Sequence, residues 1–268
     1  MTQLVSQWPT ALPDCVAVQR RNNIAVVTLD RAAKRNALSD ELVLGLQTFF
    51  TTIPRDIQGV VMCGAGENFC AGLDLNELKE ADTAESFETA LIGQRLNDAV
   101  QFCKVPVIAV LHGAVIGGGM ELAAAAHIRI AETSAFYALP EGTRGIFLGS
   151  GGSVRLPRLI GASTVIDMML SGRVYEAAEA HQILRFSQYL VEPGAGLEKA
   201  LTLASRIAQN APLANFAVLQ AIPRIVEQDP AAGLFTEMLM ATLAQNDGEA
   251  KRRLRDFLER KTGKVVGT

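Results

Sequence analysis

The stretch that decides the fold runs from Pro106 to Leu122 and reads PVIAVLHGAVIGGGMEL. Its first part, Val107 to Leu111, is a short aliphatic run bounded by turn residues, which predicts a buried strand. Three glycines, Gly117 to Gly119, then lead into Glu121 and an alanine-rich run of strong helix formers. The order predicts a strand, a turn, and a helix that begins at the glycines.

The segments around this stretch alternate between strand and helix patterns. Cys15 to Arg20 and Ile24 to Asp30 flank turn-forming residues, which predicts a hairpin. Ser39 has the character of an N-cap for a helix that extends through Phe50. Alternation of this kind favours a layered α/β architecture. Further strands are predicted over residues 59–63 and 127–131, and a further helix over residues 85–103.

The last third has a different character, because from about Ser163 the sequence predicts helix almost throughout. Prolines at or just before the start of a helical pattern indicate separate helices. We therefore expect a strand-bearing core with the site over residues 1–192 and a helical region over residues 193–268, with the boundary near Pro193. The predicted helices are Leu197 to Gln209, Leu213 to Gln228, Ala231 to Gln245 and Gly248 to Lys261.

Length and composition exclude several classes of protein. The chain has 268 residues, is 49% hydrophobic and carries a formal charge of −3, which indicates a globular protein with a full core and disfavours nucleic acid as a partner. No apolar run is long enough for a bilayer, and the first residues resemble no signal peptide, so we expect a cytoplasmic protein without membrane contact. Four cysteines without a CxxC pair and three histidines predict neither a disulfide scaffold nor a metal site.

Three glycine-rich places are candidates for chemistry: residues 64–74, 113–121 and 149–152. None matches the glycine motifs of ATP-binding or nicotinamide-binding proteins. Gly117 to Gly119 precede a helix, where free N–H groups and the helix dipole would face an oxygen atom brought close. The alternative is that these glycines only allow close packing against a neighbouring strand.

Two carboxylates accompany the glycines. Glu121 opens an otherwise uncharged helix, and Glu141 lies in a turn after the apolar segment Ala135 to Leu139. Each could be structural by itself, Glu121 as a first-turn acid that complements the helix dipole. If the chain folds back so that both meet over one substrate, the pair could add or remove water across a double bond.

At this point the sequence resembles the crotonase family, the enoyl-CoA hydratase/isomerase superfamily. The resemblance is carried by an ordered set of motifs from about residue 20 to residue 190, and the helical tail fits it in character. The motifs are Asn36-Ala37-Leu38, residues 68–75 (NFCAGLDL), residues 106–122, Leu139-Pro140-Glu141 and Gly149-Ser150-Gly151-Gly152.

The resemblance implies a spiral of ββα turns followed by helices that mediate trimer formation, often as a dimer of trimers, and acyl-coenzyme A thioesters as ligands. It implies Leu73 and Gly118 as the oxyanion-hole amides and Glu121 and Glu141 as the acid and base of a hydratase. It requires no separate cofactor, because coenzyme A is part of the substrate. We expect the coenzyme A end to be bound near Lys34, Arg35, Ala71, Asp74 and Leu75.

Within this resemblance the leading hypothesis is a 2-enoyl-CoA hydratase, since both glutamates are present. A hydratase-lyase or an isomerase that acts on an acyl-CoA, including an aromatic one, is an alternative because one oxyanion hole supports several chemistries. A noncatalytic homologue that binds coenzyme A or RNA through its basic C-terminal helix is a third possibility, which the pair of glutamates disfavours. The sequence does not define the acyl group.

Overall fold

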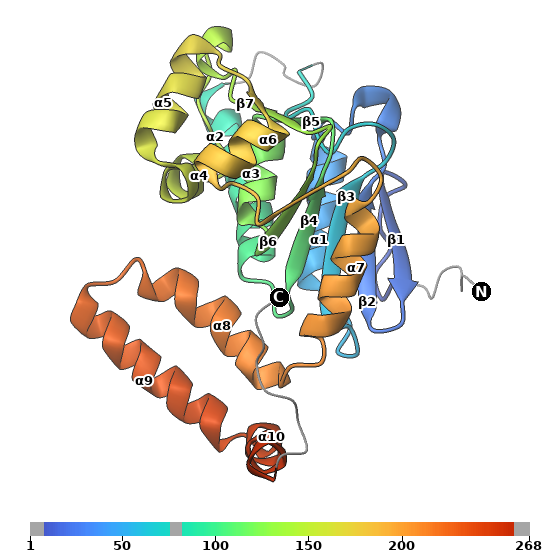
Figure 1. Ribbon diagram of the computed structural model, residues 1–268. Coiled ribbons are helices and arrows are strands. Elements are labelled where there is room, and N and C mark those ends of the chain that lie inside the picture. The colour runs from blue at the N-terminus through green and yellow to red at the C-terminus, as the bar shows by residue number, and fades with distance from the viewer. Residues whose placement is uncertain (1–7, 76–81, 260–268) are drawn as a thin grey trace. The chain divides into compact units, whose positions relative to one another are not determined.

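The computed structural model describes residues 8–75 and 82–259, and the chain divides into two compact units, Met1–Arg206 and Ile207–Thr268. The first unit contains the strands and the motifs discussed above. In Figure 1 it is coloured from blue to orange, and the second unit continues in orange and red.

The main sheet of the first unit has six strands in the order β1-β2-β3-β4-β6-β9. The hairpin β1–β2 is antiparallel and the other neighbours are parallel, with Val61 of β3 paired to Val26 of β2 and to Ile108 of β4. The central strands are buried almost continuously, as parallel strands covered on both faces require. The strands are β1 (Val16–Arg21), β2 (Ile24–Leu29), β3 (Gly59–Gly64), β4 (Val107–Leu111), β6 (Ile128–Glu132) and β9 (Tyr189–Val191).

A second sheet of three short strands lies beside the main one, in the order β5 (Ala114–Ile116), β7 (Phe136–Ala138), β8 (Tyr175–Glu176). The chain passes from β4 to β5 and then into the helix α3 (Gly118–Ala125), and from β6 to β7 and then toward α4 (Gly152–Ile160). A strand of each sheet followed by a helix is the repeating turn of the predicted ββα spiral. The predicted α/β fold class is confirmed.

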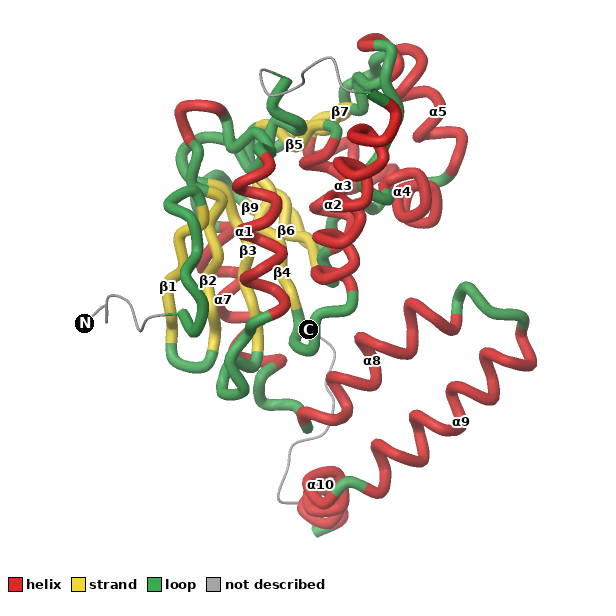
Figure 2. Tube along the Cα trace, turned by 180° about the vertical axis from the view of Figure 1, so that it is seen from behind, coloured by secondary structure: helices red, strands yellow, loops and turns green. Residues whose placement is uncertain are grey.

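Helices cover both faces of the main sheet. Figures 1 and 2 show α7 (Gly196–Ile207) on one face and α1 (Asp40–Thr51) on the other. The predicted helix start at Ser39 is confirmed, because its Oγ accepts a hydrogen bond from the Leu42 N–H at 3.2 Å. The predicted strand-to-helix order of the first half is likewise confirmed, with α2 (Thr83–Gln101) between β3 and β4.

The expectation of helix almost throughout the chain from about Ser163 was wrong in two places. Helices α5 (Ala162–Ser171) and α6 (Ala177–Glu179) and the π-helical turn η3 (Ala180–Leu184) are present, but β8 and β9 occur between and after them. These strands have only two and three residues, too few to show a period of two in the sequence. Their partners are β7 and β6, far back along the chain, so only the tertiary fold defines them.

The second unit consists of α8 (Pro212–Ile225), α9 (Pro230–Asn246) and α10 (Gly248–Leu258), with proline in the first turn of α8 and of α9 as the sequence predicts. The unit begins after Arg206, which differs from the boundary predicted near Pro193. The reason is that α7 packs on the sheet of the first unit: a Cβ on Gly196 would lie 2.5 Å from the Val110 side chain.

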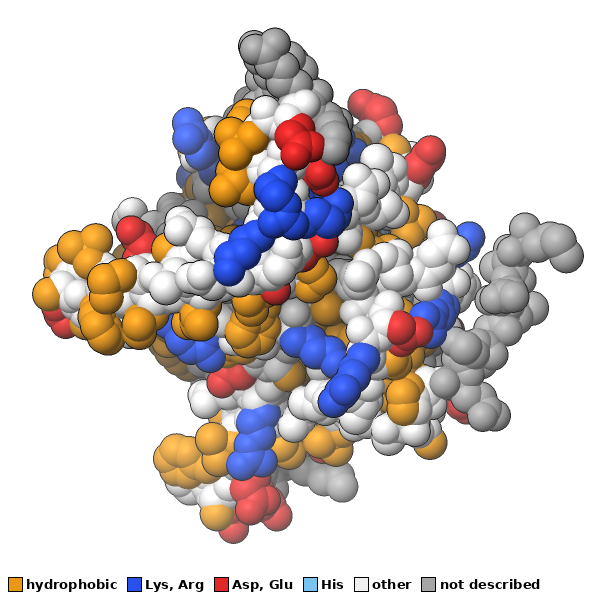
Figure 3. Space-filling model, turned by 90° about the horizontal axis from the view of Figure 1, so that it is seen from below, with side chains coloured by type: hydrophobic (Ala, Val, Ile, Leu, Met, Phe, Trp, Pro, Cys, Tyr) orange, Lys and Arg blue, Asp and Glu red, His pale blue; other side chains and the backbone are white. Residues whose placement is uncertain are grey.

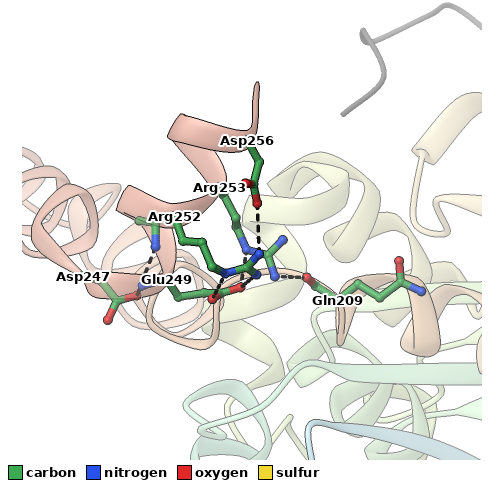
Figure 4. A network of polar contacts seen from close by, with 7 residues as sticks. Gln209, Asp247, Glu249, Arg252, Arg253 and Asp256 are labelled. Atoms are coloured by element: carbon green, nitrogen blue, oxygen red, sulfur yellow. Dashed lines mark hydrogen bonds and ion pairs between the residues drawn. The ribbon is translucent and has the colours of Figure 1, made fainter. Parts of the chain in front are cut away.

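Two basic residues of α10 form ion pairs within the helix. Figure 4 shows Arg252 and Arg253 both bonded to Glu249, with Arg252 also bonded to Asp256 at 3.0 Å. Arg253 in addition donates to the main-chain oxygen of Gln209. Intrahelical pairs of this kind are typical of a solvated amphipathic helix.

Many hydrophobic side chains of the two units reach the surface, as the face in Figure 3 illustrates. In the second unit they occur on all three helices. They are Leu213, Phe216, Val218, Ile222, Leu234, Phe235, Met238, Leu239, Leu243, Leu254, Phe257 and Leu258.

Within the described residues, no helix combines the length and apolar character that crossing a lipid bilayer requires.

Gly119 provides a test of how closely α3 packs on the chain before it. A Cβ at this position would lie 2.3 Å from the main-chain oxygen of Cys70, whereas a Cβ on Gly248 of α10 would meet nothing within 4 Å. Because overpacking of this kind costs about 1–3 kcal/mol, we expect Gly119→Ala to lower the midpoint of thermal unfolding clearly. Gly248→Ala should leave the midpoint unchanged or raise it slightly. Equal midpoints for the two variants would contradict the packing described here.

Candidate active site

The glycine turn before α3 is required by its surroundings. Gly117 has φ +53°, a conformation that favours glycine, and its N–H donates to the Ala138 main-chain oxygen at 2.9 Å. A Cβ on Gly117 would lie 2.6 Å from Oε1 of Glu141. The prediction that the glycines stand at a helix start is confirmed, and the close-packing interpretation holds as well, since Gly119 packs against Cys70.

Two main-chain N–H groups face the same spot beside this turn. Leu38 forms a parallel bridge with Leu73, in which its N–H donates to the Gly72 oxygen at 2.7 Å and its oxygen accepts from the Asp74 N–H at 3.0 Å. In that geometry the N–H of Leu73 itself points away from Leu38. Gly118 is the first residue of α3, where the N–H has no acceptor within the helix. A Cβ on Gly118 would lie 3.8 Å from the Leu73 nitrogen, so the two donors are neighbours.

Glu121 lies in the first turn of α3 with only 4% of its surface exposed. Its Oε1 accepts hydrogen bonds from the main-chain N–H groups of Ser150 at 2.9 Å and Gly152 at 2.7 Å. Burial raises the pKa of the Glu121 carboxyl, while these two hydrogen bonds and the charge of Arg155 act in the opposite direction. Its Oε2 lies on the Gly118 side, 3.9 Å from where a Cβ on that glycine would be.

Glu141 follows β7 at the start of the short 3-10 turn η2 (Gly142–Arg144) and is 6% exposed. Its Oε2 is buried and receives no hydrogen bond from the described residues. Burial is the main cause that raises the pKa of the Glu141 carboxyl, and the charge of Glu121 raises it further. A hydrogen bond from the residue's own main-chain N–H and the charge of Arg144 lower it. An unpaired buried carboxylate is costly, which favours the protonated form of Glu141.

The two carboxylates therefore converge. Glu141 Oε1 stands against Gly117 and Glu121 Oε2 stands toward Gly118, the next residue, and the charge of one influences the pKa of the other. Beside them are the N–H groups of Gly118 and Leu73. The arrangement can hold a carbonyl oxygen at the two N–H groups and a water molecule between two acids in different protonation states.

The residues predicted for coenzyme A lie on the loops next to this spot and differ in exposure. Lys34 and Arg35, at the end of the 3-10 turn η1 (Ala32–Lys34), are exposed, and the main-chain oxygen of Arg35 accepts from the Ala71 N–H at 3.0 Å. Leu75 is exposed and Ala71 is half-buried. This hydrogen bond brings the Lys34 and Ala71 loops together.

Asp74 is placed differently from the other four. Its side chain is 5% exposed, and its carboxylate is bonded to the Arg31 guanidinium at 2.9 Å. Arg31 also donates to the Ala37 main-chain oxygen at 2.5 Å. The Asp74 carboxylate thus ties the loop that carries Leu73 to the loop that carries Lys34.

Asn36 is a residue whose role the motif alone did not reveal. It is fully buried at φ +55°, its Nδ2 donates to the Ala65 oxygen at 2.8 Å and the Asn68 oxygen at 2.6 Å, and its Oδ1 accepts from the Arg31 N–H at 2.9 Å. It therefore ties the loop after β2 to the loop after β3, which carries Leu73. The left-handed conformation, for which asparagine is suited, is the signal that a sequence could carry.

The Gly149–Gly152 motif likewise had no assigned role, and its N–H groups hold Glu121. A Cβ on Gly152 would lie 2.4 Å from Cγ of Glu121, so glycine is required there. A glycine cluster directly before a helix, as at Gly117 to Gly119, is the signal that could have indicated it.

The spiral α/β core thus holds paired buried carboxylates beside two main-chain donors, a combination suited to acid–base chemistry next to a polarised carbonyl. The sequence profile described as enoyl-CoA hydratase/isomerase matches residues 19–265. The chain therefore belongs to the enoyl-CoA hydratase/isomerase family, the crotonase superfamily, whose members act on acyl-CoA thioesters.

Known proteins with similar sequences and structures agree with this assignment. The chain is 34% identical over 252 residues to the 2,3-dehydroadipyl-CoA hydratase of Escherichia coli, covering 93% of this chain and 98% of that one. It is 33% identical over 217 residues to the short-chain-enoyl-CoA hydratase of Clostridium acetobutylicum, covering 80% and 83%. The crystal structure of an enoyl-CoA hydratase candidate from Rhodopseudomonas palustris superposes with a TM-score of 0.90 at 55% identity, covering 96% and 100%.

The raised pKa of Glu141 leads to a prediction about stability and pH. Because the folded-state pKa lies above the ordinary value of 4.5, the folded protein binds more protons than the unfolded chain between the two values, and this group makes folding less favourable as pH rises. Glu141→Gln removes that contribution. We expect the difference in unfolding midpoint, variant minus parent, to become more positive from pH 4 to pH 8. A difference that is constant with pH, or that falls, would contradict it.

Proposed function

We propose that this protein is a 2-enoyl-CoA hydratase, which adds water across the 2,3 double bond of an enoyl-CoA thioester. The observation that carries the proposal is the convergence of two buried carboxylates, Glu121 and Glu141, on consecutive glycines beside the N–H groups of Leu73 and Gly118. Relatives named as hydratases support the same reaction class.

The geometry suggests a role for each group. The N–H groups of Leu73 and Gly118 donate hydrogen bonds to the thioester oxygen, where negative charge develops as C3 is attacked. Donors that act only in the transition state contribute roughly 3 kcal/mol each. Glu121 has two hydrogen bonds on Oε1 that favour its charged form, which suits it to be the base. Glu141, buried with an unpaired oxygen, suits the role of the acid.

The proposed reaction balances as follows. Glu121 takes a proton from water as the water oxygen bonds to C3, and the electron pair of the double bond moves to C2 and the thioester oxygen. Glu141 then delivers its proton to C2 and the carbonyl re-forms, so that H and OH have been added. The two carboxyl groups have exchanged protonation states, and proton exchange with solvent restores them.

We further propose that the coenzyme A end binds near Lys34, Arg35, Ala71, Asp74 and Leu75, with the two exposed cations near its phosphates. Their multiple donors suit phosphate oxygens.

No cofactor besides the coenzyme A of the substrate is part of the proposal. We also propose a homotrimer or a dimer of trimers in the cytoplasm. The exposed apolar side chains of α8, α9 and α10 support contact between copies of the chain.

The catalytic test uses two substitutions that keep size and remove the ionisable group. Glu121→Gln and Glu141→Gln should each lower kcat for hydration by about 10²- to 10⁴-fold, as expected for loss of general acid or base catalysis. Glu132→Gln is the matched control, because Glu132 is also buried and bonds to a main-chain N–H, that of Gly196 at 3.1 Å, on the strand β6. The measurement is the loss of enoyl-thioester absorbance with short, long and aromatic enoyl-CoAs, with products identified by mass spectrometry.

The outcomes separate the alternatives. Normal hydration by either Gln variant would refute its proposed role. Release of an aldehyde would indicate a hydratase-lyase, and a shifted double bond an isomerase. No reaction with any substrate by the parent protein would favour a noncatalytic binding protein.

The coenzyme A site has its own test. The double substitution Lys34→Gln and Arg35→Gln should raise KM for the enoyl-CoA, leave kcat nearly unchanged and reduce the dependence of KM on salt, because charge attraction to phosphate is screened by ions. Arg21→Gln, an exposed cation on the β1–β2 hairpin, is the control. A KM with the same salt dependence in the parent and the double variant would contradict this placement.

A further inference from the structure

The Gly149–Gly152 loop holds the proposed base by hydrogen bonds but has little stiffness of its own. Its N–H groups at Ser150 and Gly152 bond to Glu121 Oε1. Three of its four residues are glycines, and Gly151 has φ +91°. Because glycine leaves the backbone free to adopt many conformations, contacts from elsewhere must fix the position of these donors.

Helix α2 supplies those contacts from its C-terminal half. Asn97 Nδ2 donates to the Ser150 main-chain oxygen at 2.7 Å, and Gln94 Nε2 donates to the Gly149 oxygen at 3.2 Å. Gly93 allows the close approach, since a Cβ there would lie 2.3 Å from the Ser150 Oγ. Arg155 of α4 also reaches the Ser150 oxygen, but at 3.5 Å.

Asn97 donates to the peptide group that connects the two N–H donors of Glu121. The peptide between Gly149 and Ser150 carries one N–H that binds Glu121, and the peptide between Gly151 and Gly152 carries the other. The peptide between Ser150 and Gly151 joins these two, and it is its oxygen that Asn97 holds. Planar peptides rotate as units, so fixing the central one limits the orientation of both donors.

The burial of Asn97 is also unusual for a residue with a purely structural role. Its side chain is 2% exposed on a helix face that otherwise buries Leu96 and Val100, and its Oδ1 is buried and accepts no hydrogen bond from the described residues. A buried acceptor without a donor destabilises a fold. An apolar side chain at position 97 would avoid that cost. The hydrogen bond from Nδ2 to the Ser150 oxygen is therefore the contribution for which an amide is needed there.

We propose that Asn97 is a positioning residue, which holds the Ser150–Gly152 loop so that its two N–H groups keep the Glu121 carboxylate in place for catalysis. The expected effect on kcat rests on the proposed hydration reaction. The expected effect on the position of the loop does not. The charged groups that face Glu121 are Arg155 on α4, whose charge lowers the pKa of Glu121, and Glu141 after β7, whose own pKa the charge of Glu121 raises. Arg155 is itself bonded to Asp98 and Gln101 of α2.

The test is Asn97→Leu, which keeps the number and branching of the side-chain heavy atoms and removes both the donor and the unpaired acceptor. We expect kcat for enoyl-CoA hydration to fall roughly 10- to 100-fold, as for a small misplacement of a catalytic group, with KM little changed. The lower pKa of the kcat pH profile should rise, because weaker N–H donation stabilises the Glu121 carboxylate less. The midpoint of thermal unfolding should stay the same or increase. A merely structural role would instead lower the midpoint and leave the pH profile in place.

Asn215→Leu is the matched control. Asn215 of α8 also donates through Nδ2 to a main-chain oxygen, that of Ile207 at 3.0 Å, but belongs to the second unit. We expect its kcat and pH profile to match those of the parent. An Asn97→Leu variant with the kinetics of this control would overturn the inference.

A second readout does not depend on activity. Hydrogen–deuterium exchange of the peptide that contains Ser150 and Gly152 should be faster in Asn97→Leu than in the parent, with exchange in the main sheet unchanged. Equal exchange in that peptide would overturn the positioning role. If the parent hydrates no enoyl-CoA, the proposed function fails, and exchange still decides whether Asn97 holds the loop.

Discussion

The candidate site depends on one interaction, the two main-chain N–H groups that bind a buried carboxylate oxygen of Glu121. A carboxylate removed from water is expensive unless donors replace its hydration. Main-chain donors can do so without a counter-charge, which would compete for substrate oxygens. They also require the loop to approach the carboxylate closely, and the position of Gly152 against Cγ of Glu121 shows why a side chain cannot be present there.

Close approach of backbone segments is the feature that the spiral fold provides. The loop after β3, the turn before α3 and the turn after β7 come from successive layers of the chain, and they meet where Gly72, Gly117 and Gly118 lack side chains. A Cβ on Gly72 would lie 2.7 Å from the Ile116 main-chain oxygen, and a Cβ on Gly117 would lie 2.6 Å from Oε1 of Glu141. Rigid strands behind the turns keep the groups at these separations.

The two glutamates share this spot but differ in environment. Both are buried, which raises both pKa values, but the Oε1 of Glu121 is bound by two N–H groups of the Gly149–Gly152 loop, which favour its charged form. Glu141 has a buried oxygen without a donor and experiences the charge of its neighbour. Different environments allow one carboxyl group to be charged and the other protonated at neutral pH, so that one can act as a base and the other as an acid.

The sequence by itself determined the features that depend on a few neighbouring residues. The β1–β2 hairpin, the cap at Ser39, the helix start after Gly117 and the helices of the second unit all follow from turn chemistry, capping and periodicity. The ordered motifs were also enough to recognise the family, and with it the two glutamates.

Only the tertiary structure decided the features that depend on pairing between distant residues. The strands β8 and β9, the ion pair of Arg31 with Asp74, and the hold of Asn97 on the loop that binds Glu121 link residues far apart in the chain. The physical reason is that hydrogen bonds and close contacts across such separations leave no period or local motif in the sequence, whereas a turn, a cap or a helix face does.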